Sequence, residues 1–144
     1  MNLTSLQKTL LIVDDDPDDV QLFSEAVSGI NNSFRCLSAS NGEEALQLLK
    51  EAIIKPDFIF LDLNMPRMNG KQCLVQLKTD SQFADILVII YSTSKVKKDI
   101  EDTLRLGAVS FLTKPNKFDH LVKAISYVLA GKWEKVNEMP QSLA

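Results

Sequence analysis

The chain has 144 residues, of which 45% are hydrophobic and 24% are charged, and its formal net charge is −3. This composition is typical of one soluble globular domain, and its short apolar runs exclude a membrane span. The slight acidity argues against direct nucleic-acid binding, and Cys36 and Cys73 lie too far apart to indicate a zinc or disulfide motif. We therefore expect one cytoplasmic domain over residues 1–144, with residues 131–144 as a short C-terminal tail.

Five short apolar runs are spaced along the chain, the second of them weaker and mixed with polar residues. Runs of this length that do not alternate with polar residues are typical of strands buried on both faces, as in a parallel sheet. The predicted strands are Leu10–Val13, Phe34–Leu37, Phe58–Leu61, Ile86–Tyr91 and Val109–Leu112.

Segments with helical spacing of apolar residues lie between these runs and after the last one. Pro17 suits the first position of the first helix, and Gly29 is expected to end that helix as a left-handed cap. Ser40–Glu43 is read as a capping box before the second helix. The alternation of strands and helices predicts an α/β fold, a five-stranded parallel sheet with helices on both faces.

In a doubly wound sheet of this kind, ligands bind beyond the carboxyl ends of the strands. The residues that directly follow the predicted strands are therefore the candidates for function. Two carboxylates follow the first strand, a third follows the third strand, a hydroxyl follows the fourth, and an ammonium group follows the fifth. In chain order these are Asp14, Asp15, Asp62, Ser92 and Lys114.

This set of groups is suited to phosphoryl transfer. Crowded carboxylates repel each other unless a cation joins them, and oxygen ligands of this kind suit Mg²⁺. A carboxylate can also act as a nucleophile towards a phosphoryl group, whose oxygens then need a metal, a lysine and a hydroxyl. We expect Asp62 to be the acceptor, Asp14 and Asp15 to bind the metal, and Lys114 and Ser92 to bind the phosphoryl oxygens.

The chain resembles a response-regulator receiver domain over about residues 8–130. The segments that carry the resemblance are Val13–Asp15, Phe60–Pro66 with Gly70, Tyr91–Ser92, Gly107–Ala108 and Lys114–Pro115. The resemblance implies a flavodoxin-like doubly wound sheet with strand order 2-1-3-4-5. It also implies that a histidine kinase or histidine phosphotransferase phosphorylates Asp62. Mg²⁺ would be held by Asp15, Asp62 and the backbone carbonyl of Asn64, with Asp14 acting mainly through water.

The resemblance further implies that the protein acts as a conformational switch and does not catalyse reactions on other molecules. Phosphorylation would draw in the Ser92 hydroxyl, and the aromatic ring of Phe111 would turn inward. The fourth helix, fifth strand and fifth helix would then present a changed face to a downstream protein. The resulting picture is a stand-alone two-component signalling protein, a monomer or weak homodimer, that dephosphorylates itself slowly and contacts neither nucleic acid nor membrane.

Other interpretations of these residues remain open. A haloacid dehalogenase-like phosphatase would need an aspartate two residues after its nucleophile, where this chain has Asn64. A degenerate receiver acting as a binding scaffold would usually have lost the acceptor or the lysine. For the other acidic residues at the start of the first helix, Asp16, Asp18 and Asp19, capping of the helix dipole is the favoured interpretation.

Overall fold

The computed structural model describes residues 8–30 and 34–137. They form one parallel sheet with the strand order β2-β1-β3-β4-β5, which confirms the expected order. The strands are β1 (Thr9–Val13), β2 (Arg35–Ala39), β3 (Phe58–Leu61), β4 (Leu87–Ser92) and β5 (Ser110–Thr113).

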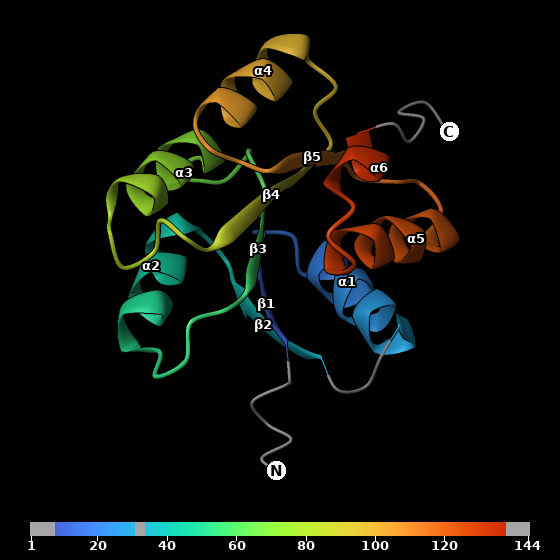
Figure 1. The fold of residues 1–144 in the computed structure, drawn as a ribbon, viewed down its shortest axis with the longest axis horizontal. Helices are drawn as coiled ribbons and strands as arrows, with labels where there is room; N and C mark the ends of the chain where they lie inside the picture. The colour runs from blue at the N-terminus through green and yellow to red at the C-terminus, as the bar shows by residue number, and fades with distance from the viewer. Residues whose placement is uncertain (1–7, 31–33, 138–144) are drawn as a thin grey trace.

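Helices cover both faces of the sheet, as Figure 1 shows. On one face lie α2 (Gly42–Glu51), α3 (Gly70–Thr79) and α4 (Lys97–Arg105), and on the other lie α1 (Pro17–Ile30), α5 (Phe118–Leu129) and α6 (Trp133–Asn137). This arrangement confirms the doubly wound α/β fold.

The strands are apolar on both sides because each side packs against a separate core. In β1, Leu11 and Val13 pack under α2 and α3, whereas Leu10 and Ile12 pack under α1 and α5, and all four are fully buried. Alternating side chains of a strand point to opposite faces, so a strand between two helical layers needs apolar residues at every position. This explains why the apolar runs of the sequence do not alternate.

Two of the predicted helix signals are wrong in detail. The first helix does not end at Gly29 but continues to Ile30, and Gly29 has no positive φ angle. The second helix is not capped by Ser40. Its N-cap is Asn41, whose side chain accepts a hydrogen bond from the backbone N–H of Glu44 at 2.8 Å. An asparagine directly beside the serine supplies an equivalent acceptor one residue later, and the helix uses it.

Part of the predicted C-terminal tail is folded. Residues 133–137 form α6, in which Val136 is fully buried in the core under α1 and α5. The ring of Trp133 lies at an edge-to-face angle to Phe58, with centroids 6.1 Å apart. Two apolar residues three positions apart are enough to dock one short turn of helix. Residues 138–144 lie outside the described part of the chain.

None of the helices formed by residues 8–30 and 34–137 combines the length and the apolar character needed to cross a bilayer.

Replacing Gly70 should destabilise the fold. A Cβ atom there would collide with the carbonyl oxygen of Asp62 and lie 2.6 Å from Cα of Leu63, both of which are backbone atoms. We expect Gly70→Ala to lower the free energy of unfolding by about 1–3 kcal/mol in urea titrations followed by circular dichroism. In Gly29→Ala, where nothing lies within 4 Å of the new methyl group, stability should stay equal or rise by about 0.5–1 kcal/mol. Equal unfolding midpoints for wild type and Gly70→Ala would contradict this account.

Candidate functional site

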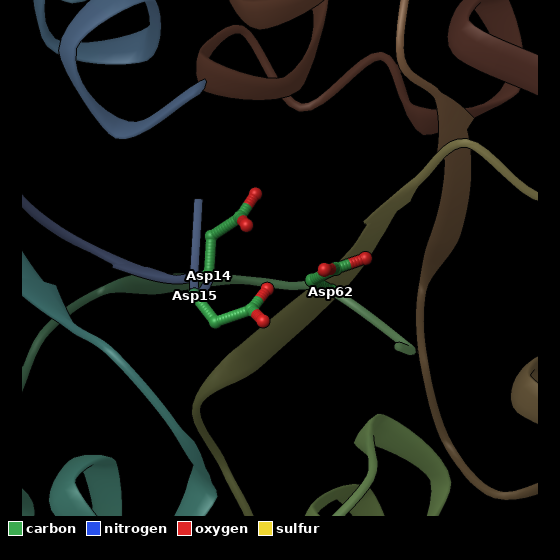
Figure 2. A group of neighbouring side chains, drawn as sticks. All are labelled: Asp14, Asp15 and Asp62. Atoms are coloured by element: carbon green, nitrogen blue, oxygen red, sulfur yellow. The ribbon is translucent and has the colours of Figure 1, made fainter. Parts of the chain in front are cut away.

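Three carboxylates meet at the carboxyl ends of two neighbouring strands. Asp14 and Asp15 directly follow β1, and Asp62 directly follows β3, its partner in the sheet. Oxygen atoms from the three groups all lie within 4.8 Å of one another, and Figure 2 shows the three side chains gathered at this edge. Asp14 and Asp62 are buried, while Asp15 is exposed. The predicted carboxylate cluster is therefore present as a spatial group.

The backbone fixes two of these residues through the hydrogen bonds of the sheet. The N–H of Asp14 donates to the carbonyl of Ala39 on β2, and the N–H of Asp62 donates to the carbonyl of Val13 on β1, both at 3.0 Å. Each carboxylate therefore projects from a strand end whose backbone is hydrogen-bonded to the neighbouring strand. The site is built on rigid elements rather than on a free loop.

Burial makes this cluster electrostatically unfavourable when it is charged. Burial raises the pKa of Asp62 to about 6, an effect that Lys114 opposes and the charge of Asp14 reinforces. Burial also raises the pKa of Asp14, again against the influence of Lys114. Both shifts arise chiefly from burial, which disfavours the charged form of a carboxyl group.

Lys114 supplies the positive charge nearest to the cluster. It follows β5, and its Nζ lies 2.7 Å from Oδ2 of Asp14, 2.8 Å from Oδ2 of Asp19 and 3.9 Å from Oδ2 of Asp62. The same ammonium group lies 5.3 Å from the centre of the Tyr91 ring. Burial by itself would lower the pKa of Lys114, but the carboxylates outweigh it and raise this pKa. Lys114 therefore stays protonated.

The other predicted site residues lie at the end of β4, on β5 and in the loop after β3. Ser92 ends β4, is fully buried, and accepts a hydrogen bond at its Oγ from the N–H of Ser94 at 3.3 Å. Phe111 lies on β5 with its ring buried in the core under α2 and α3. Asn64 is exposed in the loop after β3, and its backbone N–H interacts with the Asp62 carboxylate.

Asp19 belongs to the site, although the sequence interpretation assigned it to helix capping. That interpretation is right for Asp16, whose carboxylate accepts the N–H of Asp18 at 2.9 Å. Asp18 and Asp19 also lie in the first turn of α1, where acids favour the helix dipole, and the carboxylate of Asp19 contacts Lys114 in addition. A signal for this was available, because Asp19 precedes the fully buried Phe23 by four residues and so lies on the inner face of the helix.

Residues 10–126 match the family model of the response regulator receiver domain. The chain belongs to this family. It is 35% identical over 122 residues to protein PilH of Pseudomonas aeruginosa, covering 85% of this chain and 98% of PilH. It is 30% identical over 116 residues to the probable C4-dicarboxylate response regulator DctR of Bacillus subtilis, covering 81% of this chain but 50% of DctR. The chain thus spans half of one relative and nearly all of the other.

Two solved structures of response regulators superpose closely on this receiver domain. The phosphorylated cyanobacterial phytochrome response regulator RcpA is 27% identical, with a TM-score of 0.78 over 89% of this chain and 94% of RcpA. The Mn²⁺-bound form of response regulator Rcp1 is 25% identical, with a TM-score of 0.76 over 92% of this chain and 99% of Rcp1. Their structures therefore record a phosphorylated form and a divalent-cation form of relatives with the same fold.

The carboxylate cluster fits a hard divalent cation. Its possible ligand atoms are all carboxylate oxygens, and burial raises the pKa values of Asp14 and Asp62, so a nearby cation would favour their charged forms. Asp14 and Asp15 also line an open cleft of about 380 Å³ between the end of β1, the start of α1 and the end of β2, and Asp62 is not part of its lining. The donor set is that of a Mg²⁺ site rather than of a zinc site, because neither thiol nor imidazole groups take part.

The raised pKa of Asp62 should make the stability of the protein depend on pH. The folded state holds this proton more tightly than the unfolded state, whose reference pKa is 3.8, so stability falls as the pH rises from about 4 to above 6. In chelator-treated protein near pH 7, Asp62→Asn should therefore raise the free energy of unfolding by about 1–3 kcal/mol. The gain should vanish near pH 4, where the wild-type carboxyl is protonated.

Urea titrations across this pH range would measure the effect. As a matched control, Asp119→Asn removes an exposed carboxylate from the first turn of α5. A gain from Asp62→Asn that is the same at both ends of the pH range would contradict the assignment.

Proposed function

We propose that this receiver domain is a phosphoacceptor of a two-component phosphorelay, with Asp62 as the acceptor. The observation that carries the proposal is the convergence of Asp62, Lys114 and two further acids at one sheet edge. A carboxylate with a lysine at one side and an oxygen-rich cation site at the other is suited to forming an acyl phosphate. The phosphoryl donor would be a histidine kinase or a histidine phosphotransferase.

In the transfer step, an Oδ atom of Asp62 forms a bond to phosphorus while the bond from phosphorus to the donor's imidazole nitrogen breaks. The electron pair of the broken bond stays on the imidazole. Asp62 must be ionised to attack, and a pKa of about 6 leaves it mostly ionised near pH 7. Bound Mg²⁺ would neutralise charge on the phosphoryl oxygens, and its ligands would be Asp15, Asp62, the Asn64 carbonyl and, through water, Asp14.

Lys114 and Ser92 would bind the other phosphoryl oxygens. Lys114 is already 3.9 Å from Asp62 and stays protonated, so it can pair with a new negative charge without taking up a proton. Ser92 ends β4, the strand next to β3, and its hydroxyl can donate a hydrogen bond to an oxygen atom. These roles require a lysine and a hydroxyl at adjacent strand ends, which this chain provides.

A chain of polar contacts could relay the change from Ser92 to α4. Ser92 accepts the N–H of Ser94, and Oγ of Ser94 donates to Oδ2 of Asp99 at 2.6 Å. Asp99 and Asp102 of α4 both pair with Lys71 of α3, at 2.8 and 3.1 Å. Movement of the Ser92 hydroxyl would therefore strain the contacts that position the start of α4.

The changed surface would include α4, β5 and α5, with Phe111 as the core aromatic that turns. Exposed apolar side chains, Val96, Leu104 and Phe118, lie along these elements and give a downstream protein apolar contacts. A cytoplasmic location, a monomeric or weakly dimeric state and the absence of direct nucleic-acid contact complete the proposal. As a phosphoacceptor, the domain would not catalyse reactions on other molecules.

The two alternative functions fit the site less well. A haloacid dehalogenase-like phosphatase needs a carboxylic acid two residues beyond the nucleophile, and an amide, Asn64, stands there. A scaffold without phosphorylation would not need a half-buried lysine within 4 Å of three carboxylates, because bringing these charges out of water is costly.

Incubation with acetyl phosphate and Mg²⁺ tests the proposed function directly. Intact-mass spectrometry should find the mass of one phosphoryl group on the wild type and none on Asp62→Asn, because the amide cannot act as the nucleophile. The adduct should also be absent when Mg²⁺ is chelated. Asp57→Asn is the matched control, because Asp57 lies at the opposite end of β3 and should leave the adduct unchanged. An adduct that persists in Asp62→Asn would contradict the assignment.

Binding of Mg²⁺ should be visible without any phosphodonor. Millimolar Mg²⁺ should raise the melting temperature of the wild type by about 2–5 °C, because the cation binds the folded state and relieves carboxylate repulsion. Asp15→Asn should lose most of this rise, since it removes the exposed ligand while leaving the buried residues in place. Asp18→Asn should retain it. A rise of equal size in all three proteins would indicate non-specific salt effects and contradict the site.

A further inference from the structure

We propose that Asp19 is a positioning residue that holds Lys114 back from the phosphoacceptor and thereby limits phosphorylation. The inference rests on the proposed function, because it assumes that a phosphoryl group on Asp62 needs the Lys114 ammonium. It concerns a residue of α1 that is neither the acceptor nor one of the metal ligands proposed above. Its role would be to set how readily the Lys114 ammonium group leaves Asp19 and pairs with a phosphoryl group on Asp62.

The distances around Lys114 carry the argument. Nζ lies 2.7 Å from Asp14 and 2.8 Å from Asp19, but 3.9 Å from Asp62. The ammonium group is therefore in direct contact with two carboxylates that are not the acceptor. A phosphoryl group on Asp62 has to compete with both of them for the same cation.

Of the two competitors, Asp19 would remain effective once the metal site is filled. Asp14 adjoins the proposed cation, which would neutralise much of its charge. Asp19 is not one of the three carboxylates that form the cluster, and its carboxylate accepts a hydrogen bond from the Lys114 ammonium group. It would therefore keep its full charge and its hold on the lysine in the state that reacts.

Asp19 also cannot easily follow Lys114 towards the acceptor. It lies in the first turn of α1, one turn before Phe23, whose fully buried ring packs against Phe60 and Tyr91 with centroids 4.7 and 5.7 Å apart. Tyr91 in turn lies under the Lys114 ammonium. This packing fixes the helix relative to the sheet, so a shift of Lys114 towards Asp62 lengthens its contact with Asp19.

The exposure of the contact sets the size of the expected effect. The Asp19 side chain is 28% exposed, whereas that of Asp14 is fully buried. A partly exposed ion pair contributes modestly, and its loss corresponds to a change of roughly two- to fivefold in an equilibrium or rate constant. Removing Asp19 should therefore speed phosphorylation without disrupting the fold.

The test compares Asp19→Asn with Asp18→Asn at saturating Mg²⁺. Both variants remove one carboxylate from the first turn of α1, but the Asp18 side chain is exposed and lies outside the Lys114 contacts. Two quantities are measured, the rate constant of phosphorylation by acetyl phosphate and the dissociation constant for beryllofluoride, a phosphoryl mimic. The second requires no reaction and reports directly on how well the site accepts a phosphoryl-like group.

We expect Asp19→Asn to raise the phosphorylation rate constant and tighten beryllofluoride binding, each by roughly two- to fivefold relative to Asp18→Asn. Asp19→Ala should behave in the same way, and urea titration checks that both variants are folded. Equal values for the Asp18 and Asp19 variants, or slower and weaker reaction of the Asp19 variants, would overturn the inference alone. A wild type that neither forms an adduct nor binds beryllofluoride would instead overturn the proposed function, and the inference with it.

Discussion

The structure of this site depends on one half-buried cation, the Lys114 ammonium group, placed among carboxylates that would otherwise repel each other. Lys114 contacts Asp14 and Asp19 directly and lies within 4 Å of Asp62. The parallel sheet makes this possible, because β1, β3 and β5 end at the same edge and each end contributes a charged side chain. Removing the lysine would leave buried carboxylates without a counter-charge, and an unpaired buried charge strongly destabilises a fold.

The rest of the fold holds this edge in a narrow range of geometries. On one side, Gly70 packs its backbone against the carbonyl of Asp62, and its N–H donates to the carbonyl of Leu63 at 2.9 Å. On the other side, the Tyr91 ring lies under the Lys114 ammonium group, and Phe23 packs against both Tyr91 and Phe60. Fold stability and site geometry therefore share the same contacts, and a substitution in either would affect both.

Most of the fold and much of the site follow from local sequence signals. The strands were predictable because both faces of the sheet are covered, which forces continuous apolar runs, and residues following the strands must share one edge. The signals failed where alternatives were close in energy or depended on tertiary contacts. Ser40 and Asn41 are both good caps, so the choice depended on the exact path of the chain. Residues 133–137 form a helix because the Trp133 ring packs against Phe58 and Val136 is buried in the core. Asp19 resembles any acid in a first helical turn until Lys114, 95 residues later, is placed beside it.

The balance of charge in the site explains why it matters which carboxylate pairs with Lys114. Four carboxylates of the site, those of Asp14, Asp15, Asp19 and Asp62, face one ammonium group, so the site is strongly negative when ionised. A phosphoryl group on Asp62 would replace one negative charge by about two. A divalent cation held by Asp15 and Asp62, with Asp14 through water, would offset part of this excess, whereas Asp19 lies outside the cluster and would stay paired with Lys114. The phosphorylated state would therefore depend on moving Lys114 from a helix carboxylate to the acceptor, a shift of about 1 Å along a contact that already exists. Because that shift exchanges one ion pair for another, its free-energy cost would be small enough for a single carboxylate on α1 to control it.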